Sequence, residues 1–516
     1  MIDAKITVEK LISYAKEFLH LNAFDEVYAR NLLLRELRLT APYQGNDLDL
    51  KFIKDLTVPD VLLDELCTYA EKEGIISEGE RERYSAYVMG ILTPLPSEVN
   101  RVFKLLRESI GAQEACDYLY QLCIKNNYIQ KTAIDRNIKW DANFDKNPLE
   151  ITINLSKPEK SNKDIAKALS EPKPATEKYP LCPLCKENEG FAGTETHPAR
   201  GNIRTVSLKL DGEDWFVQYS PYSYYDEHCI AINKQHVPMV VNGATIRKLL
   251  DFVDYFPNYF IGSNASLPIV GGSILAHEHF QGGRHLMPMQ KAKNYKTYRS
   301  KNFPTVEVSI VDWYNSVVRL VSENREEISA LATQIIEAWS VYSDAEQNVV
   351  SHTGDVRHNA VTPIVRMLEK NKYCVELILR NNRTSEEYPE GIFHAHPEYH
   401  NIKKEGIGII EVMGLFILPG RLKTQLAGIA DVLMDKNKTA VEALYSPEHP
   451  LHVHADACAI LKKKYGTIKD RERAEKIIQN YVNETCAAIL DNTAVFKANK
   501  EGRAAFAKFL SSLSIA

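Results

Sequence analysis

The stretch GGSILAHEHFQGG, residues 271–283, combines two glycine pairs with polar side chains at alternating positions. In a β-strand, residues two apart project from the same face, so His277, His279 and Gln281 are predicted to form one polar row. The intervening Glu and Phe would face the opposite side. Glycines let the backbone approach a ligand closely and expose N–H groups to phosphate oxygens. The pattern favours a phosphate-handling site over a solvated strand with two incidental histidines.

The chemistry of this row suits reaction at phosphorus. An imidazole is a competent nucleophile toward phosphorus at neutral pH, with one ring nitrogen attacking while the other donates a hydrogen bond that fixes the tautomer. The amide of Gln281 can hold a non-bridging phosphate oxygen, but it cannot deliver a proton. We therefore expect a histidine nucleophile beside Gln281.

A second pattern is the pair Cys182 and Cys185 in the sequence CPLC. Two thiolates at this spacing can hold one Zn²⁺, and a tetrahedral site needs two further ligands. His236 and His277 are candidates for them. A redox pair or two unliganded thiols are the alternatives, although the surroundings lack the βαβ context of a thioredoxin-like motif.

Two further groups of residues carry weaker signals. His394 and His396 fit either a second metal or phosphate site or a polar loop beside a strand. Glu411 lies in an otherwise apolar segment predicted to be a strand, where a buried carboxylate would need a partner. The three histidines within residues 449–454 lack acidic or thiol partners at ligand spacing, which indicates a structural or surface role.

Composition excludes several classes of protein. The chain has 516 residues and a formal net charge of -5, which argues against a broad nucleic-acid surface. It contains no run of about 18 apolar residues, so no membrane span is expected. The N-terminus lacks the apolar core of a signal peptide. Nine mostly scattered cysteines suit reduced thiols, so we expect a cytoplasmic protein.

Periodicity divides the chain into an α+β middle and two helical flanks. The predicted parts are a helical N-terminal region (1–150, with a short hairpin within 129–152), a linker (151–178), a first strand-rich unit with the motif (179–345), a second strand-rich unit (346–420) and a helical C-terminal region (421–516). Strands are predicted at 203–210, 215–220, 229–232, 258–261, 274–280, 360–368, 374–381 and 406–418, and helices at 101–126, 246–256, 313–341 and 474–490. The strand-rich stretches weakly echo each other, which suggests two related half-domains.

Across nearly its whole length the sequence resembles the galactose-1-phosphate uridylyltransferases, particularly their bacterial type 2 branch. The most specific stretches are YPLCPLCKENEGFAG (179–193), YSPYSYYDEHCIAI (219–232), FIGSNASLPIVGGSILAHEHFQGG (260–283) and residues 381–420. The resemblance implies an α+β fold with two histidine-triad-like half-barrel units, each with an antiparallel sheet. It also implies a homodimer that acts in galactose metabolism.

The resemblance implies a ping-pong reaction with UDP-glucose and galactose 1-phosphate as substrates. The second histidine of the family's His-x-His-x-Gln motif, here His279, would attack the α-phosphorus and form a uridylyl-histidine. Glucose 1-phosphate would leave, and galactose 1-phosphate would take the uridylyl group to give UDP-galactose. The Gln of the motif corresponds to Gln281, and a histidine in its place would favour hydrolysis by acting as a general acid.

The resemblance also assigns binding residues. Asn264 matches an Asn that touches the nucleotide, Gly272 and Ser273 loosely match a phosphate-binding turn, and the segment Val412, Met413, Gly414 falls near a stretch that lines the base pocket. The structural zinc site of the better-studied branch maps to Cys182, Cys185, His236 and His277. Its second metal maps to His394, His396 and His358, but no carboxylate after Gln281 completes that set.

Two rival functions remain open at this point. One is another enzyme with the same motif, such as a dinucleoside polyphosphate phosphorylase or an adenylyltransferase, because the motif alone chooses neither base nor sugar. The other is a non-catalytic nucleotide-binding or zinc-stabilised interaction protein, against which the intact His279 and Gln281 argue.

Overall fold

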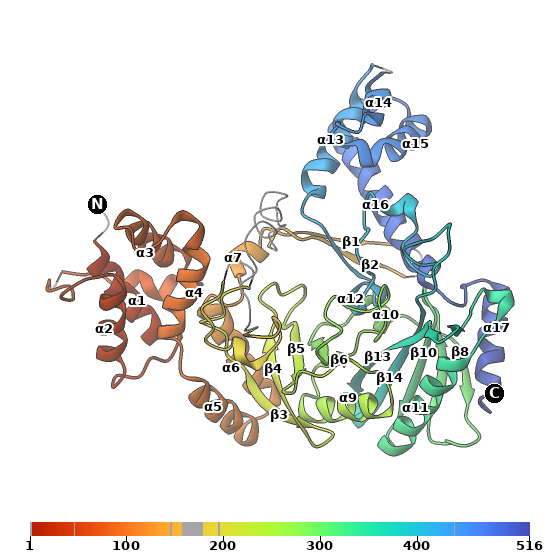
Figure 1. Ribbon diagram of the computed structural model, residues 1–516, viewed down its shortest axis with the longest axis horizontal. Coiled ribbons are helices and arrows are strands. Elements are labelled where there is room, and N and C mark those ends of the chain that lie inside the picture. The colour runs from red at the N-terminus through yellow and green to blue at the C-terminus, as the bar shows by residue number, and fades with distance from the viewer. Residues whose placement is uncertain (1–2, 46, 145–146, 157–178, 195–196, 438) are drawn as a thin grey trace.

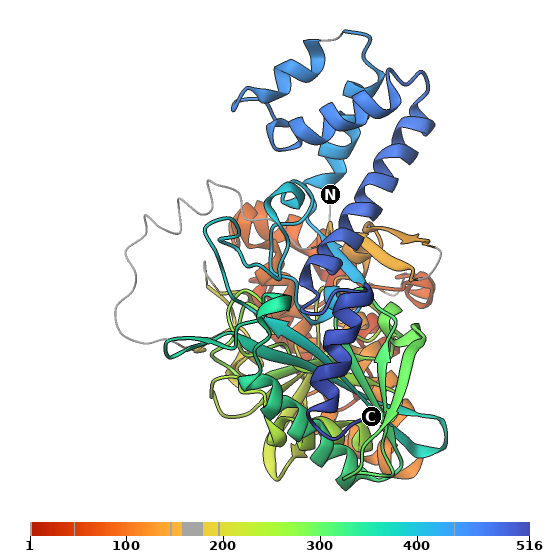
Figure 2. The same ribbon diagram turned by 90° about the vertical axis from the view of Figure 1, so that its right-hand side faces the viewer.

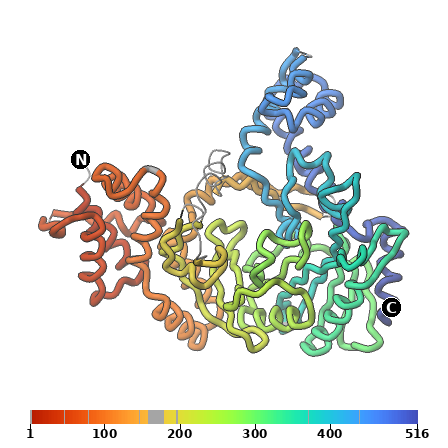
Figure 3. Tube along the Cα trace, in the orientation of Figure 1, coloured from red at the N-terminus to blue at the C-terminus, as the bar shows by residue number. Residues whose placement is uncertain are grey.

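The computed structural model describes residues 3–45, 47–144, 147–156, 179–194, 197–437 and 439–516. Among the helices in these ranges, none carries an apolar stretch of the length that crossing a bilayer requires. Most of the predicted linker 151–178 lies outside the described residues, and its first three residues belong to a strand instead. Figure 3 shows that the chain begins and ends at opposite sides of the molecule.

A ten-stranded antiparallel sheet forms the centre of the molecule (Figure 1), with the order β3-β4-β5-β7-β6-β13-β14-β10-β9-β8. Its strands are β3 (Val206–Leu210), β4 (Glu213–Tyr219), β5 (Cys229–Asn233), β6 (Phe260–Gly262), β7 (His279–Gly283), β8 (Asn294–Arg299), β9 (Glu307–Val311), β10 (Val317–Ser322), β13 (Asn359–Leu368) and β14 (Lys372–Asn381). A small ribbon, β11 (His352–Thr353) and β12 (Val356–Arg357), lies outside it.

The sheet has two halves, and the strands follow the same order in each half. In each half, a three-stranded meander leads into a helix, and two further strands follow. The helices are α9 (Gly243–Tyr255) and α11 (Arg325–Val341). In both halves the last strand, β7 or β14, inserts between the meander and the strand before it. The halves join where Gly262 of β6 pairs with Ile364 of β13. The strand order repeats from β8 onward, whereas the division predicted at residue 345 falls after α11.

The two faces of the sheet are covered differently. Helices α9 and α11 lie against one face (Figure 1), and a continuous apolar core fills the space between. The opposite face carries a second core beneath α10 (Pro288–Lys291), α12 (Ile409–Val412) and a small sheet of β1 (Ile138–Ala142), β2 (Leu149–Ile153) and β15 (Leu415–Leu418). The predicted hairpin is therefore confirmed as β1 and β2. Only the end of the strand predicted at 406–418 is a strand, since α12 precedes β15.

The N-terminal region is confirmed as helical up to α7. Its helices are α1 (Ala4–Phe18), α2 (Glu26–Glu36), α3 (Asp60–Lys72), α4 (Arg81–Leu92), α5 (Pro96–Ser109), α6 (Ala112–Lys125) and α7 (Lys131–Ile134). The helix predicted at 101–126 is interrupted at residues 110 and 111, between α5 and α6. Arg204 attaches α4 to the first half of the sheet, because its buried guanidinium donates to the carbonyls of Gly90 and Thr93 at the end of that helix.

The C-terminal region is helical, as predicted. It comprises α13 (Leu422–Met434), α14 (Thr439–Glu442), α15 (Ala455–Tyr465), α16 (Arg471–Thr493) and α17 (Lys500–Ser511). Figure 2 shows α13 to α15 projecting away from the sheet, while α16 runs back toward it. The chain then ends beside the outermost strand, where Ala516 and Arg299 exchange two backbone hydrogen bonds of 3.0 Å.

Candidate functional site

The motif does not form one continuous strand. Strand β7 begins at His279, and residues 274–278, predicted to be strand, form a loop with His277 in a bend. His277 leaves the sheet because its Nε2 donates to the carbonyl oxygen of Asn233 at 2.8 Å, while its Nδ1 faces Cys182 at 3.3 Å. The polar row within β7 therefore consists of His279 and Gln281 alone.

The intervening side chains point to the helical face, as predicted. Phe280 stacks on Trp215 with ring centroids 4.7 Å apart. The carboxylate of Glu278 accepts from the ammonium of Lys248, on α9, at 3.0 Å. An aromatic pair and a buried ion pair thus fix this segment on the helical side of the sheet, so that His279 and Gln281 are held on the opposite face.

His279 has the protonation and tautomer that a nucleophile needs. Its Nδ1 lies 2.8 Å from the carbonyl oxygen of His277, so Nδ1 carries the proton and donates it in a hydrogen bond. The lone pair is then on Nε2. Burial lowers the pKa of His279, so the neutral ring predominates at neutral pH. Among the described residues, His279 lies outside the group of potential metal ligands.

Gln281 has a partner that the sequence did not reveal. Its Oε1 lies 3.1 Å from Nε2 of His228, a residue only 2% exposed. Burial lowers the pKa of His228 to about 4, so this ring is neutral and donates from Nε2. The place of His228 depends on a strand pairing that the sequence does not show: Ile230 pairs with Gln281, and a residue two before Ile230 shares its face.

Four side chains form a group with the geometry of a zinc site. The Sγ atoms of Cys182 and Cys185 lie 3.6 Å apart, Nδ1 of His277 is 3.3 and 3.8 Å from them, and Nδ1 of His236 is 3.2 Å from Cys185. In a tetrahedral zinc site with bonds of roughly 2.1 to 2.3 Å, the ligand atoms lie about 3.4 to 3.8 Å apart. The group could therefore hold a metal ion such as zinc.

The outer partner of His277 also suits a metal ligand. Its second nitrogen donates to a backbone carbonyl, as metal-bound histidines commonly do, which fixes the tautomer. The predicted second site differs: His394, His396 and His358 each make separate local hydrogen bonds, to Ile407, Ile392 and Thr353 respectively. Within the described residues, no other group of three or more potential ligands gathers.

The loop before β7 brings together two of the predicted binding residues. The buried Asn264 accepts a hydrogen bond of 2.9 Å from the backbone N–H of Ile409, the first residue of α12. A Cβ on Gly272 would lie 2.9 Å from Nδ2 of the same Asn, so only glycine fits there without a shift. Ser273 follows and is exposed. This loop therefore presents polar groups close to the start of a short helix.

The segment Val412 to Gly414 is occupied by structural contacts. The carbonyl of Val412 accepts from Nε1 of Trp313 at 3.0 Å, and that of Met413 accepts from the N–H of Met289 at 2.9 Å. Gly414 accepts from Glu150 of β2. Val412 and Met413 are fully buried. These contacts join α10, α12 and the hairpin, and none of them involves His279 or Gln281.

The predicted need of Glu411 for a partner is met by Lys403, 3.1 Å away.

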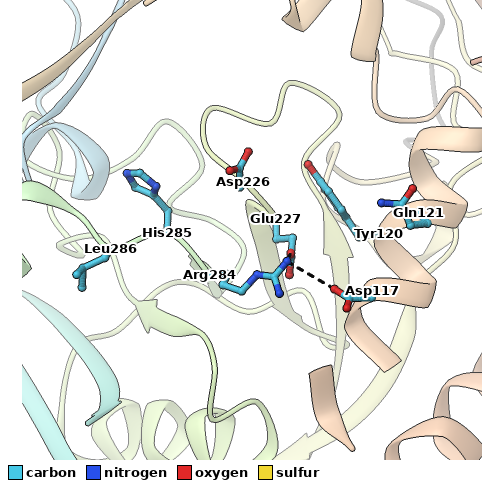
Figure 4. Close-up of a pocket in the computed structure, with 8 residues that line it drawn as sticks. All are labelled: Asp117, Tyr120, Gln121, Asp226, Glu227, Arg284, His285 and Leu286. Atoms are coloured by element: carbon cyan, nitrogen blue, oxygen red, sulfur yellow. Dashed lines mark hydrogen bonds and ion pairs between the residues drawn. The ribbon is translucent and has the colours of Figure 1, made fainter. Parts of the chain in front are cut away.

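Two cavities of about 310 and 320 Å³ open near the hairpin and share Asp226 and His285. Figure 4 shows the first, in which Arg284 binds the buried carboxylate of Glu227. The second lies between the hairpin and two tyrosines, Tyr224 and Tyr225. The same tyrosines flank His228, the hydrogen-bond partner of Gln281. His279 lines neither cavity.

Comparisons with known proteins show the family of this chain. Residues 25–238 match the model of the galactose-1-phosphate uridyl transferase N-terminal domain, and residues 252–458 match that of the C-terminal domain. A galactose-1-phosphate uridylyltransferase of Caldanaerobacter subterraneus is 42% identical over 514 residues, 98% of either chain. That of Bacillus subtilis is 40% identical over 510 residues, covering 98% of this chain and 97% of its own.

Among solved structures, yeast Ap4A phosphorylase Apa2 aligns with 65% of this chain and 98% of its own, at 10% identity and a TM-score of 0.31. A likeness that weak adds nothing to the argument. The two family models together span most of the sequence, including the metal-ligand group and the His-x-His-x-Gln motif. The chain belongs to the galactose-1-phosphate uridylyltransferase family.

Proposed function

We propose that this chain transfers a uridylyl group from UDP-glucose to galactose 1-phosphate, giving UDP-galactose and glucose 1-phosphate in galactose metabolism. Family membership supports the substrates, since the relatives at about 40% identity are galactose-1-phosphate uridylyltransferases over their full length. The observation that carries the mechanism is the hydrogen bond from Nδ1 of His279 to the His277 carbonyl, which leaves the Nε2 lone pair for attack.

The reaction has two matched steps. Nε2 of His279 attacks the α-phosphorus, an N–P bond forms, and the bond to the bridging oxygen breaks, so glucose 1-phosphate leaves with the electron pair. A phosphate oxygen of galactose 1-phosphate then attacks the same phosphorus, and the N–P bond breaks. In the uridylyl-enzyme between the two steps, the imidazole ring of His279 carries positive charge. The His277 carbonyl stabilises this charge by accepting a hydrogen bond from Nδ1–H.

Gln281 holds an oxygen of the transferring phosphoryl group without taking part in proton transfer. Its amide N–H can donate to a non-bridging oxygen where negative charge develops. The departing sugar phosphate is a weak base and needs no general acid. An amide at this position therefore suits transfer to a phosphate acceptor and gives no help to attack by water.

The remaining predicted residues have supporting roles in this proposal. Asn264, Gly272 and Ser273 form the loop that meets the nucleotide and its phosphates. Val412 to Gly414 shape the base pocket by holding α12, whose first N–H binds Asn264. The zinc site is structural, and zinc supplies a redox-inert cross-link when bound. Because His277 is in that site and its carbonyl binds His279, the cross-link also orients the nucleophile.

We further propose that the halves of the sheet are two histidine-triad-like units and that the chain forms a homodimer. The repeated order of strands supports the first proposal, since β3 to β7 and β8 to β14 follow the same path with one helix each. The family resemblance supports the second, and sedimentation of the purified protein tests it.

The decisive experiment traps the intermediate. Wild-type protein incubated with UDP-glucose labelled in the uridine is expected to retain the label on His279, mapped by peptide mass spectrometry at alkaline pH. His279→Ala should lower transfer by at least about 1000-fold while UDP-glucose still binds. The exposed His452, changed to Ala, serves as the matched control and should label normally. Label on another residue, or full activity in His279→Ala, would refute the assignment.

A further inference from the structure

Nε2 of the buried His228 lies within hydrogen-bond distance of Oε1 of Gln281. We propose that His228 is a positioning residue, which fixes the Gln281 amide with its NH2 group toward the phosphoryl group being transferred. This inference rests on the uridylyl transfer proposed above. It concerns a second residue that acts through Gln281, and His228 itself touches neither substrate nor the reacting atoms.

The two ends of an amide have opposite effects on a phosphate. Its NH2 group donates to phosphate oxygens, whereas its carbonyl oxygen repels them, and rotation by about 180° about the last side-chain bond exchanges the ends. Nε2 of His228 lies 3.1 Å from Oε1 of Gln281. When that nitrogen carries the proton it can only donate, so it selects the orientation with Oε1 inward. The NH2 end is then left to donate to substrate.

The ring of His228 is itself firmly held. It lies against Tyr225, with centroids 4.6 Å apart, and against Tyr224, with centroids 5.4 Å apart. Its backbone N–H donates to the carbonyl of Tyr225, and its carbonyl accepts from the N–H of Ser220 at 2.8 Å. With 2% of its surface exposed, the side chain is closely surrounded by protein. A donor held in this way preorganises the amide before substrate binds.

The strand pairing brings the partners together. Ile230 of β5 lies directly opposite Gln281 of β7, and His228 precedes Ile230 by two residues, so its side chain is on the same face. Gln281 is also paired on its other side, with Gly262 of β6. Its backbone is thus fixed by two neighbouring strands, and the contact with His228 restricts the orientation of the side-chain amide.

The other features of His228 agree with a dedicated donor. Its Nδ1 is buried and has no hydrogen-bond partner among the described residues, so the ring spends its one N–H on Gln281. Burial keeps this ring neutral at neutral pH, with a pKa of about 4. The neutral ring of His228 therefore supplies no positive charge beside the transferred phosphoryl group. What it contributes is a direction for one hydrogen bond.

The test compares variants in the first half-reaction. His228→Phe keeps an aromatic ring between the tyrosines but removes the donor, and it should lower kcat for uridylyl-enzyme formation by about 10- to 100-fold. The Kd for UDP-glucose should stay within about threefold. His228→Gln, which restores an N–H donor, should recover at least part of the loss. Ile230→Val is the matched control, because it trims a neighbouring side chain on the same face and leaves the contact intact.

A double-mutant cycle separates positioning from a structural role. In a Gln281→Ala background, His228→Phe should cause almost no additional loss, because the amide to be positioned is gone. Equal losses in both backgrounds, or a fully active His228→Phe protein, would overturn the proposal. If wild-type protein forms no labelled uridylyl-enzyme, the proposed function fails. Labelled wild-type protein with an additive cycle would refute the role of His228 alone.

Discussion

One residue, His277, connects the metal-ligand group to the nucleophile. Its Nδ1 faces the sulfur of Cys182 at 3.3 Å, and its carbonyl accepts from Nδ1 of His279 at 2.8 Å. The sequence predicted both histidines, but it could not predict this relation. The strand pattern placed their side chains on one face, whereas the bend at His277 turns one ring toward the cysteines and leaves its carbonyl for the other.

Removal of metal is expected to weaken both stability and catalysis. Cys185→Ser should bind less than a tenth of the wild-type zinc, unfold at a temperature several degrees lower, and form the uridylyl-enzyme more slowly, because the loop and His277 are no longer fixed. Metal analysis, calorimetry and the labelling rate measure these effects. Cys458→Ser is the control, because Cys458 is also a buried cysteine but belongs to α15 and not to the metal-ligand group. Zinc-free wild-type protein of unchanged stability would contradict the site.

A second residue-scale prediction concerns His454, a fully buried histidine in the C-terminal region. Its Nε2 donates to Gln425 and its Nδ1 accepts from Asn401, so the ring is neutral, and burial lowers its pKa to about 4. The unfolded chain binds a proton near pH 6.5, whereas the folded chain does not, so stability falls as pH drops below 6.5 toward 4.

The expected size is about 2 kcal/mol of unfolding free energy lost between pH 8 and pH 5 through this one residue. His454→Gln should flatten that part of the stability curve, measured by urea unfolding at several pH values. His452→Gln, at an exposed position two residues away, should leave the curve unchanged. Parallel curves for wild type and His454→Gln would show that the histidine does not titrate in this way.

At the scale of elements, sequence patterns located most strands and helices but misjudged four junctions, one of them the break at residues 110 and 111 between α5 and α6. The helix predicted at 313–341 contains β10 and begins only at Arg325. Asn324 caps it by accepting from two N–H groups, a signal that was present in the sequence. Val317, Val318 and Val321 favour a strand, but apolar residues of this kind also fit a helical pattern over a short window.

The other two errors have tertiary causes. Residues 274–278 leave the sheet because the side chain of His277 is drawn toward Cys182, a contact between residues 95 positions apart. Residues 409–412 form α12 because a loop side chain, that of Asn264, binds the first N–H of the helix from 145 positions away. Neither partner is visible in the local sequence, so local propensity could not predict these structures.

The close packing of β7 against β6 leads to a prediction for Gly282. A Cβ on Gly282 would lie 2.2 Å from the carbonyl oxygen of Phe260, so β6 and β7 pack too closely for any side chain there. Gly282→Ala should therefore force the strands apart, cost about 2 kcal/mol or more, and slow transfer by misplacing Gln281. Urea unfolding and the labelling rate test this. Gly79→Ala, at an exposed position with open space, should have little effect, and a silent Gly282→Ala would contradict the packing.

At the scale of the whole molecule, the sequence predicted an α+β centre with helical flanks, and this is confirmed. It did not predict which strands would join the halves, because the pairing of β6 with β13 connects residues about a hundred positions apart. Nor did it predict the return of the chain to β8 at its end. Contacts of this range depend on loop paths and burial rather than on local pattern.

The C-terminal end of the chain returns to β8 and buries an aromatic side chain of α17. Phe509 of α17 is fully buried against Trp339 and Tyr342 at the end of α11, with ring centroids 5.5 and 4.8 Å away. Ser316, before β10, exchanges two hydrogen bonds with the backbone of Phe496. The final residues therefore pack over the aromatic rings at the end of α11 and beside the start of β10.

Phe509→Ala should lower the unfolding free energy by about 3 to 5 kcal/mol, through lost burial and the cavity left behind. Removal of residues 496–516 should go further, exposing Trp339 and making the protein aggregate on heating well below the wild-type midpoint. Glu501→Ala, at an exposed position on the same helix, controls for changes to α17 itself. If the shortened chain unfolded with wild-type stability, the sheet would not need this cover, and α17 would be a surface attachment rather than part of the core.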